Sequence, residues 1–385
     1  MAKRRSFRFK DVHGFLQSLF GEDVHAKRVY SLANATLGVM TNASLAIHII
    51  GHGLAQARGL LSKHAIKQVD RLLSNQGIVV WDIFAYWVPH MVAQRKAIVV
   101  AMDWTDFDAD GQTTIVLSLV TRHGRTTPLI WLTVSKDELK GNRNAYEDTV
   151  LARLSQVLNP EVKVTILADR GFGDHKLFNL LEHGLGFEYV IRFRGNINVT
   201  DANGATRPSA QWVGKGGRAR TLRKALVTNE HYEVGTVVCV HAKGMNEPWC
   251  LAASDPVEKT RTLINYYAKR WGIEPSFRDT KDLRFGMGLK ATHIKKPERR
   301  DRLLLLNAFA IVLLTLLGAA GESLGMDRHL KANTVKYRTH SLFRQGCLLY
   351  DLIPNMPTER LKPLMQRFAE LILQHRTFSD VFCVV

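Results

Sequence analysis

The sequence is poor in cysteine and has no pattern that would pair its cysteines. Cys239, Cys250, Cys347 and Cys383 form no CxxC motif, and no histidine stands at zinc-finger spacing from them. We therefore expect thiols in a reducing cytoplasm, with neither a disulfide framework nor a cysteine-ligated metal. Residues 1–10 are basic, but the apolar stretch that a secretory signal needs does not follow them, so we expect no such signal.

Long hydrophobic runs are also scarce. Residues 303–320, LLLLNAFAIVLLTLLGAA, have about the length of a membrane span. They contain Asn307 and Thr315, and no second run of this kind accompanies them. A lone run of marginal length is more typical of a buried core helix, so we expect a core helix and no membrane association.

Acidic residues are outnumbered, which leaves the chain strongly basic. Its 385 residues include 53 Lys and Arg against 35 Asp and Glu, a formal net charge of +18. A hydrophobic content of 46% indicates a folded chain of two or three domains. Positive charge of this size attracts polyanions and favours nucleic acid as the partner, although an ordinary basic protein can carry the same charge.

The N-terminal part, residues 1–95, is expected to be a helical DNA-binding domain. Its segment SKHAIKQVDRLLSN (62–75) places the apolar residues on one face of a helix. Lys63, Lys67 and Arg71, four residues apart, form a separate basic stripe that could follow a phosphate backbone. A solvated surface helix has the same pattern, so only the total charge favours DNA.

From residue 96 the pattern changes to short β-branched segments. Three of them, 96–104, 113–120 and 128–134, are separated by polar turns and predict antiparallel strands of one sheet. A helix is predicted over 144–158 and a buried parallel strand over 162–169. This order begins an RNase H-like core, but other α/β topologies share it.

We therefore predict an α/β protein with an RNase H-like catalytic core, a β-rich insertion, and helical N-terminal and C-terminal regions. The regions after the N-terminal domain are the first part of the core (96–193), the insertion (194–257), the second part of the core (258–325) and the C-terminal region (326–385). The insertion contains a glycine-rich basic stretch, RPSAQWVGKGGRARTLRK. On charge alone, its candidate DNA contacts are Arg218, Arg220, Arg223 and Lys224.

Two aspartates close strands that we expect to be neighbours. Asp103 stands in AMDWTD and Asp169 in ILADRGF. Two adjacent carboxylates repel each other unless a cation lies between them, and hard oxygen ligands suit Mg²⁺. Such a site can activate a water or a 3′-hydroxyl for phosphoryl transfer. Aspartates at strand ends also serve as N-caps or turn formers without any metal.

A third candidate group lies in YYAKRWGIEPSFRDTKD (266–282). Tyr267, Arg270, Glu274 and Lys281 are separated by 3, 4 and 7 residues, offsets that share one stripe of an α-helix. The stripe offers a carboxylate for a metal between two cations, although a solvent-facing helix with an ordinary ion pair has the same composition. Because proline follows Glu274 directly, the helix is expected to be kinked or to begin near that point.

This spacing is similar to the signature Y-x2-R-x3-E-x6-K of the insertion-sequence-four family of transposases with a DDE triad. The resemblance continues in the expected order through most of the chain, in segments 63–75, 101–107, 168–172, 247–258 and 329–338. It implies an RNase H-like core that is interrupted by a β-rich insertion before the glutamate.

The resemblance also implies roles for individual residues. Asp103, Asp169 and Glu274 would be the catalytic triad and bind Mg²⁺, with Mn²⁺ as a substitute. The DNA phosphates near the cut would be held by Tyr267, Arg270 and Lys281. Related transposases stack a flipped base on a tryptophan at the place of Trp249, whereas a tryptophan in such a strand is otherwise usually packing.

The activity that the resemblance implies is cut-and-paste transposition of an insertion sequence. The enzyme would nick double-stranded DNA at the element's end, form a hairpin intermediate and join the freed end to target DNA. It would act as a homodimer on DNA, in the bacterial cytoplasm at the nucleoid. Two other classes stay open: a catalytically dead DNA-binding repressor, and a metal nuclease that cleaves without joining.

Overall fold

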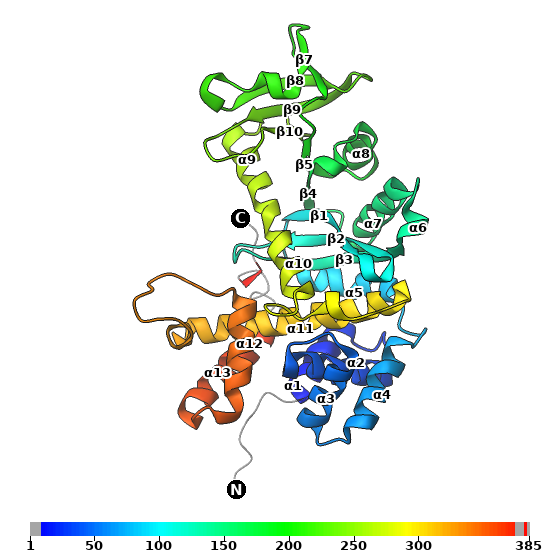
Figure 1. Ribbon diagram of the computed structural model, residues 1–385, viewed down its shortest axis with the longest axis vertical. Helices are drawn as coiled ribbons and strands as arrows, with labels where there is room; N and C mark the ends of the chain where they lie inside the picture. Colours follow the sequence, from blue (N-terminus) through cyan, green and yellow to red (C-terminus); the bar gives the residue numbers. More distant parts are fainter. Residues whose placement is uncertain (1–8, 374–380, 383–385) are drawn as a thin grey trace.

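Helices precede the first strand of the chain. The computed structural model describes residues 9–373 and 381–382. Its first elements are α1 (Phe9–Phe20), α2 (Ala26–Asn42), α3 (Ile47–Arg58), α4 (Ser62–Leu73) and α5 (Val80–Val92). In Figure 1, α1 to α4 gather at one end of the molecule and α5 lies against the sheet. The predicted helical character of the N-terminal part is confirmed for its described residues, 9–95; residues 1–8 of the predicted region lie outside the described residues.

A large mixed sheet follows, which gives the protein its α/β character. Within the described residues it has ten strands in the order β3-β2-β1-β4-β5-β10-β9-β8-β6-β7. Its strands are β1 (Ala97–Phe107), β2 (Gln112–Val120), β3 (Thr126–Ser135), β4 (Lys163–Ala168), β5 (Glu188–Phe193), β6 (Asn198–Thr200), β7 (Thr206–Pro208), β8 (Arg220–Val227), β9 (Tyr232–Val240) and β10 (Trp249–Ala253). Neighbours β1 and β2, and β2 and β3, pair antiparallel, and β1 and β4 pair parallel. These pairings confirm the predicted antiparallel strands and the buried parallel strand.

The first strand is longer than its hydrophobic pattern predicts. Pairing with β2 continues from Asp103 to Phe107, through the polar residues Thr105 and Asp106. Hydrogen bonding to β2 keeps this polar end in the sheet, a contribution that hydrophobic periodicity does not register. Asp103 therefore lies within β1 rather than at its end.

The strands of residues 194–257 extend the same sheet. β10 pairs antiparallel with β5, so that Cys250 lies opposite Phe193, and β9 and β8 follow outward. Figure 1 shows this part of the sheet projecting away from the N-terminal helices. The glycine-rich basic stretch, residues 207–224, therefore belongs to the same sheet as Asp103, which lies in β1, and Asp169, which directly follows β4.

The remaining helices flank the sheet or follow it. They are α6 (Lys136–Leu139), α7 (Arg143–Val157), α8 (His175–Asn179), α9 (Thr260–Lys269), α10 (Ile273–Lys281), α11 (Pro297–Ser323), α12 (Leu342–Leu352) and α13 (Thr358–Leu373). Helix α11 crosses the molecule between the sheet and the N-terminal helices (Figure 1). Where it crosses α12, Gly318 and Gly346 allow backbone contact, because a Cβ on Gly318 would lie 1.9 Å from the Leu342 carbonyl oxygen.

The apolar run of residues 303–320 lies inside α11. An 18-residue window of this helix, which has the length and hydropathy of a membrane span, is 83% buried within the fold. In the described part of the chain, the other candidate is the pair α2 and α3, which is bent by 97°. The predicted core helix is confirmed.

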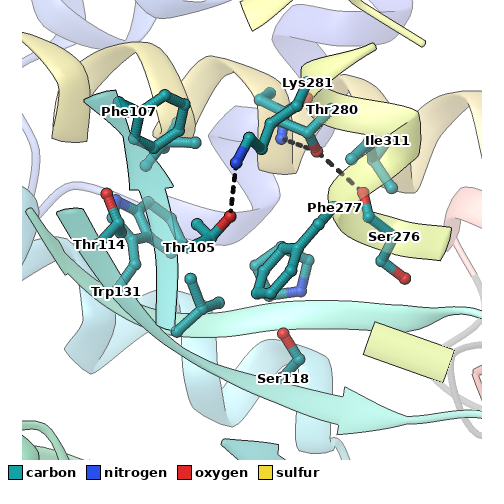
Figure 2. Close-up of a pocket in the computed structure, with 14 residues that line it drawn as sticks. Thr105, Phe107, Thr114, Ser118, Trp131, Ser276, Phe277, Thr280, Lys281 and Ile311 are labelled. Atoms are coloured by element: carbon teal, nitrogen blue, oxygen red, sulfur yellow. Dashed lines mark hydrogen bonds between the residues drawn. The ribbon is translucent and has the colours of Figure 1, made fainter. Parts of the chain in front are cut away.

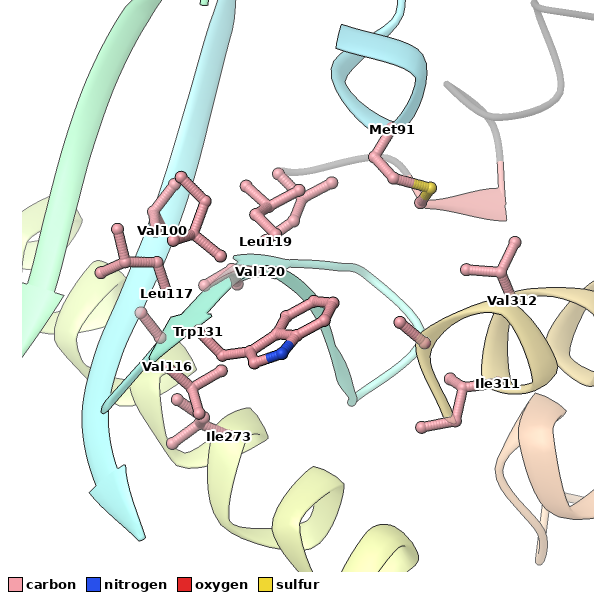
Figure 3. Close-up of a cluster of buried hydrophobic side chains, with 14 of the residues drawn as sticks. Met91, Val100, Val116, Leu117, Leu119, Val120, Trp131, Ile273, Ile311 and Val312 are labelled. Atoms are coloured by element: carbon pink, nitrogen blue, oxygen red, sulfur yellow. The ribbon is translucent and has the colours of Figure 1, made fainter. Parts of the chain in front are cut away.

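The core beside the first strands fixes the position of α10. Figure 3 shows Met91, Val116, Trp131, Ile273 and Val312 in one cluster, contributed by two strands and three helices. Ile273 is fully buried there, and burial of such a side chain contributes about 1.5–3 kcal/mol to the free energy of folding. The next residue along the chain, Glu274, is consequently held at the edge of the sheet.

Candidate active site

Strand pairing brings the two aspartates together. In the parallel ladder, Met102 of β1 pairs with Ala168 of β4, so Asp103 and Asp169 are the next residue on each strand. Asp103 continues in β1, whereas Asp169 leaves β4 and caps a short 3₁₀ helix, with its Oδ1 accepting from the Gly171 amide at 2.8 Å. The N-cap role considered for such aspartates therefore applies to Asp169.

Arg270 connects Asp103 to Glu274. Its Nη1 lies 3.2 Å from Asp103 Oδ2, and its Nη2 lies 3.2 Å from Glu274 Oε1. Arg270 is only 5% exposed, whereas the carboxylate of Glu274 reaches solvent. The guanidinium thus occupies the space between two carboxylates that were expected to share a cation.

The site is electrostatically strained for Asp103. Burial raises the pKa of Asp103 to about 6; Arg270 opposes this rise, and the charges of Asp169 and Glu274 add to it. The strand ladder sets Asp169 beside Asp103, and Arg270 contacts both Asp103 and Glu274, so the three acids lie in one region of the structure. Neighbouring carboxylates such as these are stabilised by a cation placed beside them.

The Tyr–Arg–Glu–Lys stripe is divided between three elements. Tyr267 lies in α9, Arg270 opens the 3₁₀ helix η6 (Arg270–Gly272), and Glu274 and Lys281 belong to α10. The single α-helix that the spacing alone predicts is therefore interrupted, near the place where the proline predicts a kink or a new helix start. Because α10 begins at Ile273, Pro275 stands in its first turn, where a missing N–H is tolerated. The prediction of a helix start near the proline is confirmed.

The outer members of the stripe face different neighbours. Tyr267 is 1% exposed, and its ring centroid lies 4.8 Å from that of half-buried Trp249, nearly edge-on at 76°. At the other end, Lys281 Nζ donates to Thr105 Oγ1 at 2.9 Å and to the Asp106 carbonyl at 2.7 Å. Figure 2 shows Lys281 reaching from α10 across to Thr105 of β1. Arg270 thus has the closest contact with the carboxylates among the basic members.

A small cavity lies beneath α10. It has a volume of about 40 Å³, and its walls include Phe277 of α10, Trp131 of β3 and Asn307 of α11 (Figure 2). Most of the lining is apolar, which leaves the Oδ1 of buried Asn307 without a hydrogen-bond partner. The contact between α10 and the sheet is therefore incompletely packed below the glutamate.

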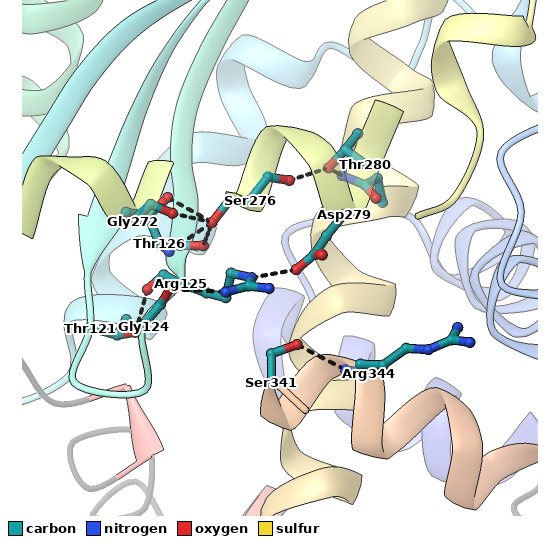
Figure 4. Close-up of polar contacts among 11 residues, drawn as sticks. Thr121, Gly124, Arg125, Thr126, Gly272, Ser276, Asp279, Thr280, Ser341 and Arg344 are labelled. Carbon is teal, nitrogen blue, oxygen red and sulfur yellow. Dashed lines mark hydrogen bonds and ion pairs between the residues drawn. The ribbon is translucent and has the colours of Figure 1, made fainter. Parts of the chain in front are cut away.

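Polar contacts also hold α10 to the sheet. The Ser276 Oγ accepts from the Thr126 amide at 2.8 Å and donates to the Gly272 carbonyl at 2.8 Å. Arg125 Nε lies 2.7 Å from Asp279 Oδ2. Figure 4 shows both links between the β2–β3 turn and α10. We call the four residues Arg125, Thr126, Ser276 and Asp279 the α10 clamp.

Sequence reasoning missed a second basic group beside the aspartates. Arg143 Nε donates to Glu147 Oε1 at 3.1 Å, and the same oxygen accepts from Trp104 Nε1 at 2.8 Å. The Arg143 guanidinium also lies 5.4 Å from the Trp104 ring centroid and 5.7 Å from that of Phe172. Trp104 and Phe172 follow Asp103 and Asp169, so Arg143 lies beside the site. Its sequence context, a polar helix start, gave no signal of this.

The basic residues proposed from charge differ in their surroundings. Lys63, Lys67 and Arg71 are exposed on α4, opposite its buried apolar face. Arg218, Arg220 and Lys224 are also exposed, whereas Arg223 is half-buried. Its Nη1 donates to Thr236 Oγ1 at 2.6 Å and its Nη2 to the Glu258 carbonyl at 2.7 Å. Arg223 therefore holds β8 to its neighbours.

The donor atoms at the site fit a hard divalent cation in kind. Asp103 stands beside Asp169 in the strand ladder and shares the Arg270 guanidinium with Glu274, so the site offers carboxylate oxygens, which hard divalent cations prefer as ligands. Their spacing is not that of a formed site: among the described residues, no three His, Cys, Asp or Glu side chains lie close enough to ligate one ion. Arg270 accounts for this spacing, because its guanidinium contacts Asp103 and Glu274 from between them.

Comparison with known proteins gives one family. Residues 94–313, more than half of the chain, match the family described as "Transposase DDE domain". This span begins just before β1 and ends within α11, so it includes Asp103, Asp169 and Glu274. No curated protein matches the chain.

Proposed function

The chain belongs to the transposase DDE domain family, and we propose that it is the transposase of a bacterial insertion sequence. Its signature residues, Tyr267, Arg270, Glu274 and Lys281, favour the insertion-sequence-four family. Within that family the chain resembles the transposase of the insertion sequences that flank the bacterial tetracycline-resistance transposon. We propose that it acts on double-stranded DNA in the cytoplasm, at the nucleoid.

The topology supports an RNase H-like catalytic core. The strand order β3-β2-β1-β4-β5 has three antiparallel strands on one side, followed by β4 and β5 parallel to β1. In this proposal, residues 96–193 and 258–325 form the core around a β-rich insertion, 194–257. Residues 1–95 form the DNA-binding domain, and residues 326–385 form a C-terminal region that is helical in its described part, which excludes 374–380 and 383–385.

Two observations support the proposal: the pairing of Met102 with Ala168 sets Asp103 beside Asp169, and Arg270 contacts both Asp103 and Glu274. We propose that Asp103, Asp169 and Glu274 are the catalytic residues and hold Mg²⁺, with Mn²⁺ as a substitute. When bound, such an ion supplies the Lewis acidity that activates the attacking oxygen and stabilises the leaving one. Arg270 contacts Asp103 and Glu274, and a phosphate of bound DNA would offer it an alternative partner.

The other residues of the site position DNA. We propose that Tyr267, Arg270 and Lys281 hold phosphates near the cut and that Trp249 receives a flipped base. Lys63, Lys67 and Arg71 on α4, with Arg218, Arg220 and Lys224 on the outer sheet, extend the contact by charge. Arg223 was included on the same ground, but its contacts with Thr236 and Glu258 favour a structural role.

The reaction sequence uses one site repeatedly. Water attacks a phosphorus at the element's end, and the bond to the 3′-oxygen breaks. The freed 3′-hydroxyl attacks the opposite strand to form a hairpin, which water reopens, and the 3′-hydroxyl finally attacks target DNA. Each step exchanges one P–O bond for another, so the same side chains can serve all of them. A homodimer on DNA would hold two element ends together.

The test is a cleavage and joining assay on DNA that carries the flanking inverted repeats, with and without Mg²⁺. Asp103→Ala, Asp169→Ala and Glu274→Ala should each abolish cleavage and leave binding to end DNA largely intact. The matched control is Asp137→Ala, which removes an exposed aspartate of α6. Cleavage that survives in one of the three variants would exclude that residue. A wild-type protein that binds without cleaving would be a repressor, and one that cleaves without joining would be a nuclease.

A further inference from the structure

The turn after α10 exposes two large apolar side chains. Leu283 is 76% exposed and Phe285 is 57% exposed, within three residues of each other. Single exposed apolar residues are common on protein surfaces, but a close pair of this size indicates a contact surface. The pair directly follows Lys281, whose ammonium group contacts β1 two to three residues beyond Asp103.

This turn, the 282–288 loop, is held rigidly. Asp282 Oδ1 accepts from the Arg284 amide at 2.8 Å and from the Phe285 amide at 2.6 Å. The Met287 amide donates to the Asp279 carbonyl at 2.8 Å, and the Met287 carbonyl accepts from the Leu45 amide at 2.8 Å. Met287 itself is buried. The loop is thus fastened to α10 and to the N-terminal helices, and its exposed apolar side chains cannot withdraw by a simple collapse of the backbone.

The charges around the loop identify its partner class. Arg284 lies over the Phe285 ring, with its guanidinium carbon 5.1 Å from the ring centroid. Arg278 and Lys290 are exposed on either side of the loop in the sequence. The carboxylate of Asp282 is engaged by backbone amides. A second copy of this +18 chain would bring like charges together here, whereas a polyanion is attracted.

We propose that the 282–288 loop is a wedge for duplex DNA, with Phe285 and Leu283 entering a base step and Arg284 following to the phosphates. This inference rests on the proposed function only in taking duplex DNA as the substrate. Apolar side chains inserted between base pairs unstack the step and kink the duplex. A rigid support favours such insertion, because little ordering of the protein has to accompany the unstacking.

The decisive experiment compares two double variants in DNA binding without divalent ions. Leu283→Ala/Phe285→Ala removes the wedge and no charge. Its matched control, Tyr337→Ala/Leu373→Ala, removes an exposed aromatic residue and an exposed leucine from other elements. The probes are two DNA duplexes, one with an element end and one of unrelated sequence. Each duplex is also prepared as a series in which a two-base mismatch is placed at successive positions. 2-Aminopurine at successive positions reports unstacking.

We expect the wedge variant to bind intact duplex about tenfold more weakly, with an unchanged salt dependence. A mismatch at the insertion step should restore most of the loss, since the unstacking is then already present. The 2-aminopurine signal at that step should appear with the wild type and the control, but not with the wedge variant.

Three results would overturn the proposal: unchanged binding, an equal loss on intact and mismatched duplexes, or an altered oligomeric state in sedimentation with DNA binding intact. The last would assign the loop to self-association. Failure of the transposase assignment is distinguishable, because it would appear as absent Mg²⁺-dependent cleavage by the wild type, a reaction that these binding measurements do not require.

Discussion

Arg125 and Asp279 form an ion pair, with Nε 2.7 Å from Oδ2, that joins the β2–β3 turn to the helix carrying Glu274. Asp279 is 9% exposed. Burial raises its pKa, and the hydrogen bond and charge of Arg125 oppose the rise. Arg125 therefore offsets part of the cost of burying the Asp279 carboxylate away from water. Together with Ser276 and Thr126, it determines where α10 meets the sheet.

Breaking this pair should reduce both stability and cleavage. Arg125→Ala leaves Asp279 buried without its partner, a change that costs about 3–5 kcal/mol in fully buried pairs. We expect about 2 kcal/mol of unfolding free energy here, because the arginine side chain is 27% exposed. Urea unfolding measures the loss of unfolding free energy. A single-turnover nicking assay at saturating DNA measures whether the cleavage rate, which depends on the position of Glu274, also falls.

A double variant distinguishes a role of the clamp in positioning Glu274 from a general loss of stability. Arg125→Ala/Asp279→Ala removes the unpaired charge and should recover most of the stability. If the clamp positions Glu274, nicking by this double variant should stay slow, whereas recovery of nicking together with stability would leave the clamp only a structural role. Arg125→Lys, which keeps the charge, should lie between the wild type and Arg125→Ala in both measurements.

A second buried carboxylate should make stability depend on pH. Burial raises the pKa of Asp301 to about 7, although hydrogen bonding to Thr133 opposes the rise. Glu298 raises the pKa further and Arg300 lowers it. Because the folded protein favours the protonated form, this stabilisation is fully present below the unfolded pKa, near 4, and is lost as pH rises through about 7.

Asp301→Asn should remove this dependence, because the neutral amide keeps an oxygen for the Thr133 amide. The difference in unfolding free energy between the variant and the wild type should grow in favour of the variant from pH 5 to pH 8. Its slope should be at most about 1.4 kcal/mol per pH unit. A difference that is constant over this range would mean that Asp301 is ionised throughout.

The elements that the sequence predicts well are those with local patterns. The antiparallel strands, the parallel strand and the core helix follow from the spacing of apolar residues and from turn residues. The two aspartates were predictable because each stands at a strand position that the pattern itself locates. The outer strands, by contrast, could be placed in the sheet only once β10 was known to pair with β5.

Contacts across long sequence distances were not predictable. Arg125 and Asp279 are 154 residues apart, and nothing in either local segment indicates that they meet. Arg270 was expected on one helical stripe with Glu274, and that spacing also fits a 3₁₀ turn followed by a new helix. A separation of four residues places the side chains of Arg270 and Glu274 next to each other in both arrangements. It could not indicate that the guanidinium also reaches Asp103.

The basic residues of the outer sheet should separate into two groups by salt dependence. Replacing Arg218, Arg220 and Lys224 with Ala should make the log–log slope of DNA affinity against salt shallower by up to about 2.7, or roughly 0.9 per phosphate contact. Arg223→Ala is the matched control: it should lower thermal stability, because Thr236 and Glu258 lose a donor, and leave the slope unchanged. Equal slopes in both variants and the wild type would exclude this loop from DNA binding.

Trp249 is the residue at which packing and a role on DNA are hardest to separate. Its ring meets Tyr267 edge-on at 4.8 Å, and the guanidinium carbon of Arg270, which contacts Asp103 and Glu274, lies 5.8 Å from the centroid of the buried Tyr267 ring. If Trp249 receives a flipped base, Trp249→Ala should slow hairpin formation more than the first nick, because only the second step requires a sharply distorted end. The lost stacking corresponds to about 1–3 kcal/mol, or roughly one to two orders of magnitude in that step.

An abasic site at the flipped position should reduce this difference between Trp249→Ala and the wild type, since no base remains to be stacked. Tyr267→Phe provides the control on the protein side, because it keeps the ring against Trp249 and removes only the hydroxyl. If Trp249 serves packing alone, Trp249→Ala should lower the melting temperature and slow nicking and hairpin formation equally. Measuring both rates beside the melting temperature decides between the two, and an equal loss with a lower melting temperature would exclude the stacking role.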